Sequence, residues 1–347
     1  MRLRRSDPHG PGISRVRRGK GFSYVGVDGT LVDPATKERI SALVVPPAWQ
    51  EVWISPHPNG HIQAVGTDVK GRRQYLYHQA WREQRDQAKH ERVRRLAREL
   101  PEVRASVTRD LRGRGLTKQR VVAGALRMLD AGMFRTGGEE YEETNGSHGI
   151  ATLLPEHVRV SGEVVRFSYP AKSGQHREAD LTDPPLAALV RSLKRKQQPG
   201  EHLMRWEDAG GWHDLHGSDI NEGFKRLAGE DFTVKDLRTW AATVTAAAAL
   251  ARVTPPPVSE RERRKAEREA IAMVAEHLGN TVSVARASYV DPGVLDAFAV
   301  GRTIQAALRR NLTKADIARL ERGELAATRG RSALERSVLR LLERGVR

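Results

Sequence analysis

Short runs of β-branched and aromatic residues, separated by turn residues, occupy the chain between Phe22 and Tyr77. Runs of this kind that are bounded by Pro, Gly and Asn predict strands. The predicted strands lie at residues 22–25, 43–45, 52–55 and 61–65. The pattern therefore predicts a small β-rich domain over residues 21–82. Residues 1–20 are rich in Arg, Gly and Pro and show no apolar period, which predicts a flexible basic arm.

After Trp81 the apolar positions recur at a helical spacing. The predicted helices lie at residues 91–100, 121–129, 184–196, 219–227, 234–251 and 260–277, with two more after about residue 314. Between them, β-prone segments at 149–154, 158–160, 164–169 and 176–181 predict a small antiparallel sheet. The expected fold class is therefore α+β, with a small β-rich N-terminal domain and a larger, mostly α-helical domain over residues 83–347 that contains this sheet.

The net charge of the chain indicates the kind of partner that it binds. The chain has 59 Lys and Arg against 43 Asp and Glu, a net charge of +16 and a sequence pI near 10.5. An excess of this size, spread along the chain, indicates a polyanion partner such as nucleic acid. Composition alone leaves a ribosome-associated or merely soluble cationic protein equally open.

The composition and motifs of the chain argue against several kinds of binding site and against a membrane or secreted location. The chain has no cysteine, which excludes disulfides and thiolate zinc sites. It has no long apolar run, no hydrophobic leader and no nucleotide-binding glycine motif. His213 and His216 lack a nearby third ligand in the sequence. We therefore expect neither a cofactor nor a metal, and a cytoplasmic protein associated with the nucleoid.

One tyrosine stands out in this basic chain. Tyr289 follows the helix-ending Gly279 and lies two residues before Asp291, which with Pro292 forms a helix-starting pair. A phenol with a pKa near 10 is a poor nucleophile at neutral pH, so it needs cations that favour phenoxide and stabilise a phosphorane. The sequence suggests a tyrosine held out to attack a DNA phosphate, provided that cations lie nearby.

Three cations are candidates for this role. Arg135 lies in the Gly-rich stretch 132–138, and Lys172 lies at the tip of a predicted hairpin, where a loop of Pro, Ser and Gly can close over a ligand. An exposed hairpin lysine is also the commonest kind of lysine, so this position alone favours an ordinary surface lysine over a catalytic one. Arg238 and Lys235 lie three residues apart at the start of the helix 234–251, a position where positive charge is unfavourable unless it binds an anion.

These motifs resemble the type IB DNA topoisomerases of the compact kind found in poxviruses and bacteria, from about Tyr24 to Tyr289. In that family an Arg, a Lys, a second Arg, a His and a Tyr form the site in this order. The resemblance assigns Arg135, Lys172, Arg238 and Tyr289 to it, and places Asn280 where the viral pattern has the His. Asn after Gly is also typical of a helix C-terminus, so a capping role for Asn280 stays open.

A second group of residues is predicted to contact DNA. It lies in the stretch 71–78 and comprises Arg72, Arg73, Gln74, Tyr75 and Tyr77. Alternation places both tyrosines on one face of a strand, and the resemblance implies that this stretch contacts the major groove. The alternative is that the two tyrosines are buried at a domain seam.

The resemblance implies an enzyme that relaxes positive and negative supercoils without ATP or metal. Tyr289 would form a 3′-phosphotyrosyl bond, which the 5′-hydroxyl then reverses. Lys172 would be the general acid, with assistance from Lys235. The implied partner is double-stranded DNA, clamped by a monomer. Two alternatives remain open: a tyrosine recombinase, which shares the constellation but acts as a multimer, and a non-catalytic DNA-binding protein.

Overall fold

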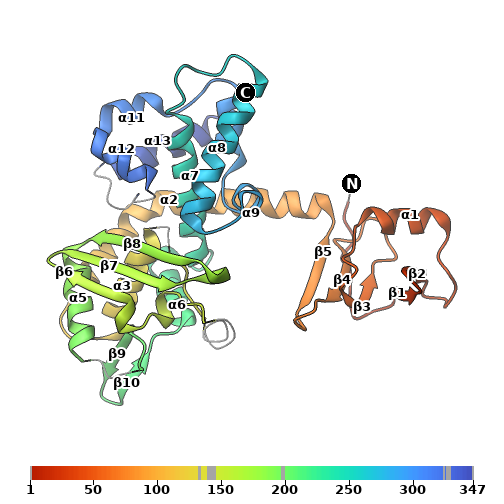
Figure 1. Cartoon of the computed structure of the whole chain (residues 1–347), viewed down its shortest axis with the longest axis horizontal. Helices are drawn as coiled ribbons and strands as arrows, with labels where there is room; N and C mark the ends of the chain where they lie inside the picture. Colours follow the sequence, from red (N-terminus) through yellow and green to blue (C-terminus); the bar gives the residue numbers. More distant parts are fainter. Residues whose placement is uncertain are drawn as a thin grey trace. The chain divides into compact units, whose positions relative to one another are not determined.

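The computed structural model describes residues 2–131, 134–138, 146–196, 200–322, 325 and 330–345 (Figure 1). The chain divides into two compact units, here called the N-terminal unit (Met1–Lys89) and the C-terminal unit (His90–Arg347). A single long helix, α2 (Gln79–Leu111), runs from one unit into the other. The sequence-based boundary after residue 82 lies within this helix.

The N-terminal unit is built on an antiparallel sheet of five strands in the order β2-β1-β3-β4-β5. Its strands are β1 (Ile13–Arg18), β2 (Gly21–Val25), β3 (Gln50–Ile54), β4 (Ile62–Thr67) and β5 (Arg73–Tyr77). Helix α1 (Pro34–Ala42) contributes Ile40 to the small core of this unit.

The prediction of a flexible arm over residues 1–20 is wrong for much of that stretch. Residues 13–18 form β1, which pairs with β2 and β3, and the backbone of Arg4 bonds to the Asn59 carbonyl at 2.9 Å. Within β1, Ile13 faces the core, whereas Arg15 donates to the Pro46 carbonyl at 3.0 Å and lies over the Phe22 ring. Because arginines occupy positions of β1 where apolar residues would mark a strand, the hydrophobic pattern of the sequence did not reveal this strand.

The predicted strand at 43–45 is also wrong. Asp33 caps α1 by accepting from the Thr36 backbone at 2.9 Å, and Leu43 ends that helix. Val44 then takes a left-handed conformation with φ of 50°. An Asp-Pro start signal therefore outweighs the β-propensity of the short apolar run.

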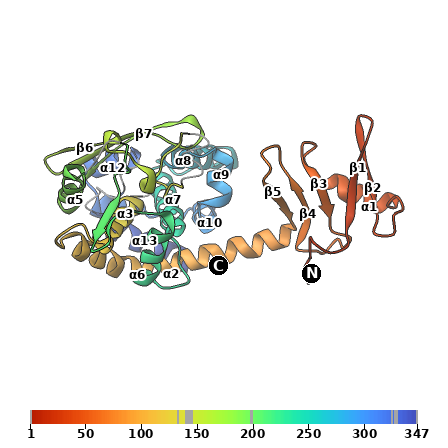
Figure 2. The same cartoon turned by 90° about the horizontal axis from the view of Figure 1, so that it is seen from below.

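The C-terminal unit is mostly helical (Figures 1 and 2). After α2, its helices are α3 (Lys118–Asp130), α5 (Pro184–Arg195), α6 (Gly217–Ala228), α7 (Val234–Leu250), α8 (Glu260–Leu278), α9 (Val282–Ser288), α10 (Pro292–Ala299), α11 (Gln305–Asn311), α12 (Lys314–Glu321) and α13 (Arg331–Glu343). Each predicted helix overlaps α2 or one of these helices, whereas the sequence pattern did not single out α9 or α11.

A three-stranded antiparallel sheet of β6 (Val158–Ser161), β7 (Val164–Pro170) and β8 (His176–Thr182) packs against α5, and β9 (Arg205–Asp208) pairs with β10 (Gly211–Asp214) in a separate hairpin. The predicted strand at 149–154 is instead a 3₁₀ turn over Ile150–Thr152. Its backbone bonds to the Arg135 segment rather than to the sheet, as described below. Together with the helical remainder, these sheets confirm the α+β class.

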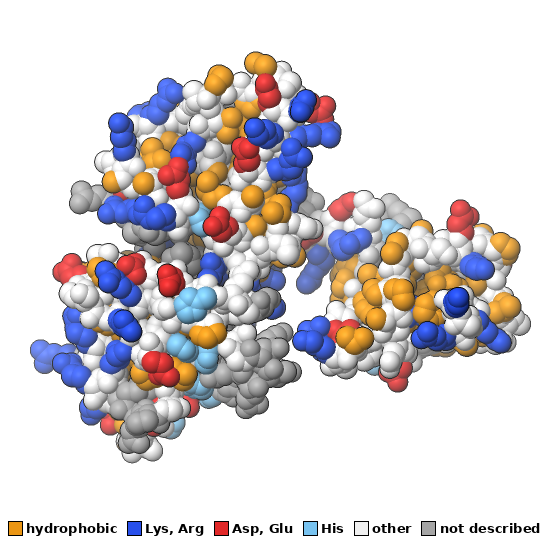
Figure 3. All heavy atoms as spheres, viewed as in Figure 1, with side chains coloured by type: hydrophobic (Ala, Val, Ile, Leu, Met, Phe, Trp, Pro, Cys, Tyr) orange, Lys and Arg blue, Asp and Glu red, His pale blue; other side chains and the backbone are white. Residues whose placement is uncertain are grey.

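Charged side chains cover both units. On the face drawn in Figure 3, Lys and Arg are spread over each unit with Asp and Glu among them. Within the described parts of the chain, no helix is both long and apolar enough to cross a membrane.

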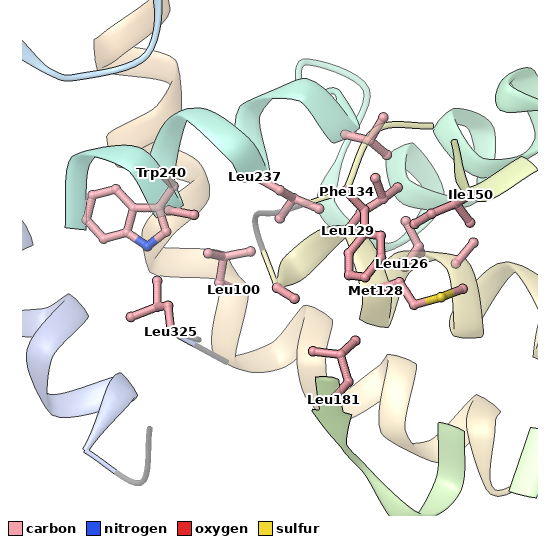
Figure 4. Packing of buried hydrophobic residues seen from close by; sticks show 14 of the residues in the cluster. Leu100, Leu126, Met128, Leu129, Phe134, Ile150, Leu181, Leu237, Trp240 and Leu325 are labelled. Carbon is pink, nitrogen blue, oxygen red and sulfur yellow. The ribbon is translucent and has the colours of Figure 1, made fainter. Parts of the chain in front are cut away.

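The core of the C-terminal unit gathers around α7. Trp240 and Leu237 of this helix belong to one buried cluster with Leu100 of α2 and with Phe134, which precedes the site residue Arg135 (Figure 4). Nearly every residue of α7 is buried, and its alanines allow neighbouring helices to approach closely. A helix packed in this way cannot easily shift, so the residues at its start are held in fixed positions.

Candidate active site

A cavity of about 360 Å³ in the C-terminal unit collects the candidate residues from four separate segments. Tyr289, Arg135, Lys172, Arg238 and Lys235 all line it. The remaining lining residues are Leu129, Thr136, Gly137, Gly138, Ser147, His148 and Val234. The structure thus places together every residue that the sequence assigned to the chemical step, apart from Asn280, which contacts Arg135 as described below.

Arg135 lies on a short extended segment that is held by the residues after 148. The Arg135 carbonyl accepts from the Ile150 backbone at 2.9 Å, and the Thr136 carbonyl accepts from the Ala151 backbone at 2.7 Å. Gly137 and Gly149 touch backbone to backbone, and a Cβ on Gly149 would lie 2.3 Å from the Gly137 nitrogen. Gly132 and Met133, at the start of the predicted motif, lie outside the described residues.

Asn280 belongs to the C-terminal cap of α8 and also to the site. Gly279 ends the helix with φ of 60°, and the Asn280 backbone donates back to the Ala275 carbonyl at 2.9 Å. Its side-chain Oδ1 accepts from Arg135 Nη2 at 2.7 Å. Its Nδ2 is buried and makes no hydrogen bond of full geometry with any described residue. Asn280 therefore takes part in the cap of α8 and also lies beside the cations of the site.

The end of α8 gathers guanidinium groups. Arg135 donates to the Leu278 carbonyl at 3.3 Å, and Arg238 donates to the same carbonyl at 3.0 Å and to the Phe134 carbonyl at 2.7 Å. The negative end of a helix dipole favours cations here. Burial, followed by the charge of Arg135, lowers the pKa of Arg238 from its ordinary value. Two positive groups are thus held together before any anion binds.

A third arginine at this helix end was not predicted. Arg177 of β8 donates to the carbonyls of Glu276 and His277, the first at 3.3 Å. Burial lowers its pKa, and Arg135 is among the charges that act on it. Arg177 thereby ties the hairpin that carries Lys172 to α8. Neither spacing nor charge pattern in the sequence marks this residue, because the carbonyls that it binds are about a hundred positions away in the chain.

Tyr289 is at the C-terminal end of α9 and is only 8% exposed. The guanidinium carbon of Arg238 lies 5.8 Å from the centre of its ring. Burial alone would raise the pKa of the Tyr289 phenol, but the charges of Arg238, Arg135 and Lys235, with a contribution from the Asn280 side chain, outweigh it and lower the pKa. The surroundings therefore favour phenoxide, as a tyrosine nucleophile requires.

Lys172 lies where the sequence placed it, at the tip of the hairpin between β7 and β8. It begins the 3₁₀ turn Lys172–Gly174 and is exposed at the cavity edge. The Ala171 backbone donates to the Gln175 carbonyl at 2.7 Å and closes the loop. An exposed ammonium group that lines the cavity can interact with an anionic ligand bound there.

The two basic residues near the start of α7, Lys235 and Arg238, lie in different environments. Arg238 is buried at 4% exposure, whereas Lys235 is exposed at the cavity. Between them, Asp236 accepts from the Thr233 backbone at 2.9 Å and so caps the start of α7. Both cations therefore lie at the positive end of α7 and line the same cavity.

The predicted DNA-contact residues lie in the N-terminal unit. Arg73, Tyr75 and Tyr77 of the edge strand β5 are exposed, and the two tyrosine rings stack with centroids 6.0 Å apart. Arg72 and Gln74 both donate to Asp68, at 2.7 and 2.9 Å. Burial of the two tyrosines within this unit is excluded, which leaves an exposed aromatic and basic strand edge.

Histidines near the site have other partners. His148 lines the cavity, its Nδ1 lies 2.6 Å from the Thr152 carbonyl, and its ring meets that of His157 edge to face. His213 stacks on Trp206. Among the residues that the structure describes, no cluster of three potential metal ligands is found. His148 is a cavity residue that the sequence analysis did not single out.

Comparison with known proteins identifies the family. Residues 78–297 match the family described as "Eukaryotic DNA topoisomerase I, catalytic core", and residues 21–68 match "Bacterial DNA topoisomerase IB, N-terminal domain". A DNA topoisomerase 1B of Acanthamoeba polyphaga mimivirus is 31% identical over 288 residues, which cover 80% of this chain and 85% of the viral protein. The chain belongs to the type IB DNA topoisomerases.

This membership makes the protein a DNA topoisomerase, an enzyme of the isomerase class. All six candidates for the chemical step, Lys235 included, lie inside the region that matches the catalytic core. A crystal structure of the XerH site-specific recombinase bound to its difH substrate was also found, with 15% identity, a TM-score of 0.35, and coverage of 58% of this chain and 52% of that one. A likeness of this extent carries no further argument.

Proposed function

We propose that this topoisomerase relaxes positive and negative supercoils by transient cleavage of one DNA strand through Tyr289, without ATP or a metal. The observation that carries the proposal is the single cavity in which Tyr289 meets Arg135, Arg238 and Lys172. A phenol of lowered pKa beside fixed guanidinium groups matches what attack on a phosphodiester demands.

In the proposed step, the Tyr289 oxygen forms a bond to phosphorus while the bond to the 5′-oxygen of the next nucleotide breaks. The phenol proton passes to solvent, and the departing 5′-oxygen receives a proton from Lys172, with Lys235 assisting. The products are a 3′-phosphotyrosyl enzyme and a 5′-hydroxyl end. Since one phosphoester replaces another, the 5′-hydroxyl can attack back and reseal the strand without an energy source.

Arg135 and Arg238 supply the electrostatic stabilisation. Their guanidinium groups offer several donors in a fixed plane, which suits the nonbridging oxygens of a phosphorane better than a lysine does. Both are already held at the end of α8, so little reorganisation is needed in the transition state. Asn280, through its buried Nδ2, donates a further neutral hydrogen bond to a nonbridging oxygen.

Contacts with duplex DNA are proposed for the N-terminal unit. The exposed face of β5 offers Arg73 to phosphate and the stacked Tyr75 and Tyr77 to bases or sugars, and Gln74 and Arg72 lie beside them. A monomer that closes on one duplex fits an enzyme in which the catalytic constellation comes from a single chain. We place the enzyme in the cytoplasm, with the nucleoid as its working site.

The test is relaxation of negatively and of positively supercoiled plasmid in EDTA without ATP. The wild-type protein is expected to relax both, whereas Tyr289→Phe, which removes only the hydroxyl, is expected to bind DNA and relax neither. Relaxation by Tyr289→Phe at the wild-type rate contradicts the proposal, and so does a metal or ATP requirement. Recombination between paired sites without plasmid relaxation would instead favour the recombinase alternative.

A further inference from the structure

Helix α2 holds the polypeptide on both sides of the cavity through two arginines. Arg94 donates to both carboxylate oxygens of Asp291, from Nε at 2.8 Å and from Nη2 at 2.9 Å. Arg92 makes the same kind of paired contact with Asp236, from Nε at 3.1 Å and from Nη2 at 2.8 Å. Such forked contacts fix orientation as well as distance, because both donors must align with both acceptors.

The two arginines point in different directions from the helix. Side chains two positions apart on a helix diverge by about 200°, so Arg92 and Arg94 reach opposite neighbours. Arg92 reaches the start of α7, next to Lys235 and Arg238, and Arg94 reaches the start of α10. Both partner carboxylates are almost wholly buried, with side-chain exposures of 2% and 4%.

Asp291 lies two residues after Tyr289 and controls the path of that segment. Its side chain caps α10 by accepting from the Gly293 backbone at 2.9 Å. Its own backbone donates to the Thr243 hydroxyl of α7 at 3.1 Å, and that hydroxyl lies 3.3 Å from the Tyr289 carbonyl. The backbone on the C-terminal side of Tyr289 is thereby tied to α7 through Thr243 and to α2 through Arg94.

The direction of the phenol depends on this attachment. Tyr289 ends α9, a helix of only two turns, so the rigidity of that helix alone fixes its terminal residue poorly. Packing against α7 and α8 holds the Tyr289 ring from one side, and the residues that follow Tyr289 add the constraint on its backbone. A nucleophile that is displaced by about 1 Å from its line of attack loses about a hundredfold in rate.

We propose that Arg94 is a positioning residue for the nucleophile: through its paired contact with Asp291 it sets the direction in which Tyr289 leaves α9 and faces Arg135 and Arg238. This inference rests on the proposed function, in which Tyr289 is the attacking group. It assigns to α2, a helix that contributes no residue to the cavity lining, a share in the chemical step.

The test compares single-turnover cleavage by the wild-type protein, Arg94→Ala, Arg94→Lys and Asp291→Asn on a short duplex with a cleavage site mapped beforehand with the wild type. Arg98→Ala is the matched control, because Arg98 pairs from the same helix with Glu343 of α13, outside the site. DNA affinity and melting temperature are measured for each variant. Arg94→Ala is expected to cleave about a hundredfold more slowly, with DNA affinity within about threefold of wild type and Arg98→Ala unchanged.

A second substrate separates positioning of the nucleophile from protonation of the leaving group. When sulfur replaces the 5′-bridging oxygen, the leaving group no longer needs a proton, so Lys172→Ala is expected to recover on this substrate. Arg94→Ala is expected not to recover. Asp291→Asn keeps a side-chain oxygen for the α10 cap but loses the charge, and it decides the matter if Arg94→Ala fails to fold.

The outcomes distinguish the two proposals. Absence of cleavage by the wild type on both substrates defeats the proposed function itself. If the wild type cleaves, a loss smaller than about tenfold in both Arg94→Ala and Asp291→Asn overturns the positioning role, and so does recovery of either variant on the sulfur substrate. A larger loss without recovery, and with a partial return of activity in Arg94→Lys, supports it.

Discussion

Arg135 Nη2 lies 2.7 Å from Asn280 Oδ1, so the amide orients the guanidinium that faces the cavity. This contact leaves the Asn280 Nδ2 donor buried without a partner of full geometry among the described residues. The same side chain also helps to lower the pKa of the Tyr289 phenol, so it lies close enough to act on that hydroxyl. The pair therefore combines a neutral donor and a charged one at the same place.

Two substitutions at Asn280 separate its contributions. Asn280→Asp keeps an acceptor for Arg135 but removes the Nδ2 donor and adds a negative charge near the phosphate, so we expect a cleavage rate at least about a hundredfold lower. Asn280→Ala is expected to lose about tenfold. The backbone cap of α8 persists in both. Single-turnover cleavage at wild-type rate in Asn280→Ala would limit the residue to capping.

The lowered pKa of Tyr289 predicts a pH profile. Since burial opposes ionisation and the charges of Arg238, Arg135 and Lys235 outweigh it, the phenoxide forms at lower pH than in a free tyrosine. Cleavage should therefore rise with pH and level off below the ordinary phenol pKa of about 10. Lys235→Gln removes one of these charges and should move the rising limb to higher pH.

The control for that shift is Lys225→Gln. Lys225 of α6 pairs with Glu230 at the surface at 3.1 Å and does not line the cavity. An unchanged limb in Lys235→Gln, measured by single-turnover cleavage across the pH range, would show that Lys235 does not act on the phenol.

Gly149→Ala should damage the site through the backbone. The added Cβ would meet the Gly137 nitrogen and Cα at 2.3 and 2.4 Å, and backbone atoms cannot swing aside. The segment that carries Arg135 must shift, so we expect a loss of cleavage rate of more than about tenfold. Gly210→Ala, whose Cβ would meet only side-chain atoms, of Asp208 at 3.2 Å and of His213 at 3.9 Å, should cleave normally. Equal activity of the two variants would disprove the expected clash.

Arg73→Ala tests the DNA contact proposed for β5. If Arg73 binds one phosphate, its removal should weaken binding to all sequences alike and reduce the log-log salt slope of the affinity by about 0.9. Arg264→Ala is the control, because Arg264 pairs with Glu260 on the exposed face of α8. Binding titrations at several salt concentrations measure both, and equal slopes for Arg73→Ala and wild type would remove Arg73 from the interface.

The sequence predicted the parts of this site that local chemistry specifies. Gly279 marked the end of α8 because glycine readily takes the left-handed conformation that commonly ends a helix, and the β pattern placed Lys172 at a hairpin tip. Two features of the N-terminal unit escaped this reasoning. Strand β1 carries several arginines and is recognisable only by its pairing with β2 and β3, and the cap at Asp33 starts α1 where short apolar runs suggested a strand.

Contacts between distant segments could not be derived from pattern alone. The convergence of Arg135, Arg177 and Arg238 on α8 joins positions up to 144 residues apart. From the sequence alone, repulsion between three positive charges argues against such a cluster. Only the structure shows the carbonyls at the end of α8 that accept hydrogen bonds from the arginines and so hold them together. The resemblance to a family brought Arg135 and Arg238 together before the structure did, and it offered nothing on Arg177 or Arg94.

The most direct test of the central claim is capture of the covalent intermediate on a suicide duplex whose short cleaved strand diffuses away. After digestion with a protease, mass spectrometry should find the peptide that contains Tyr289 linked to the 3′-phosphate of the retained strand, and Tyr289→Phe should give no adduct. A stable adduct at another residue, or a 5′-phosphate linkage, would contradict the account.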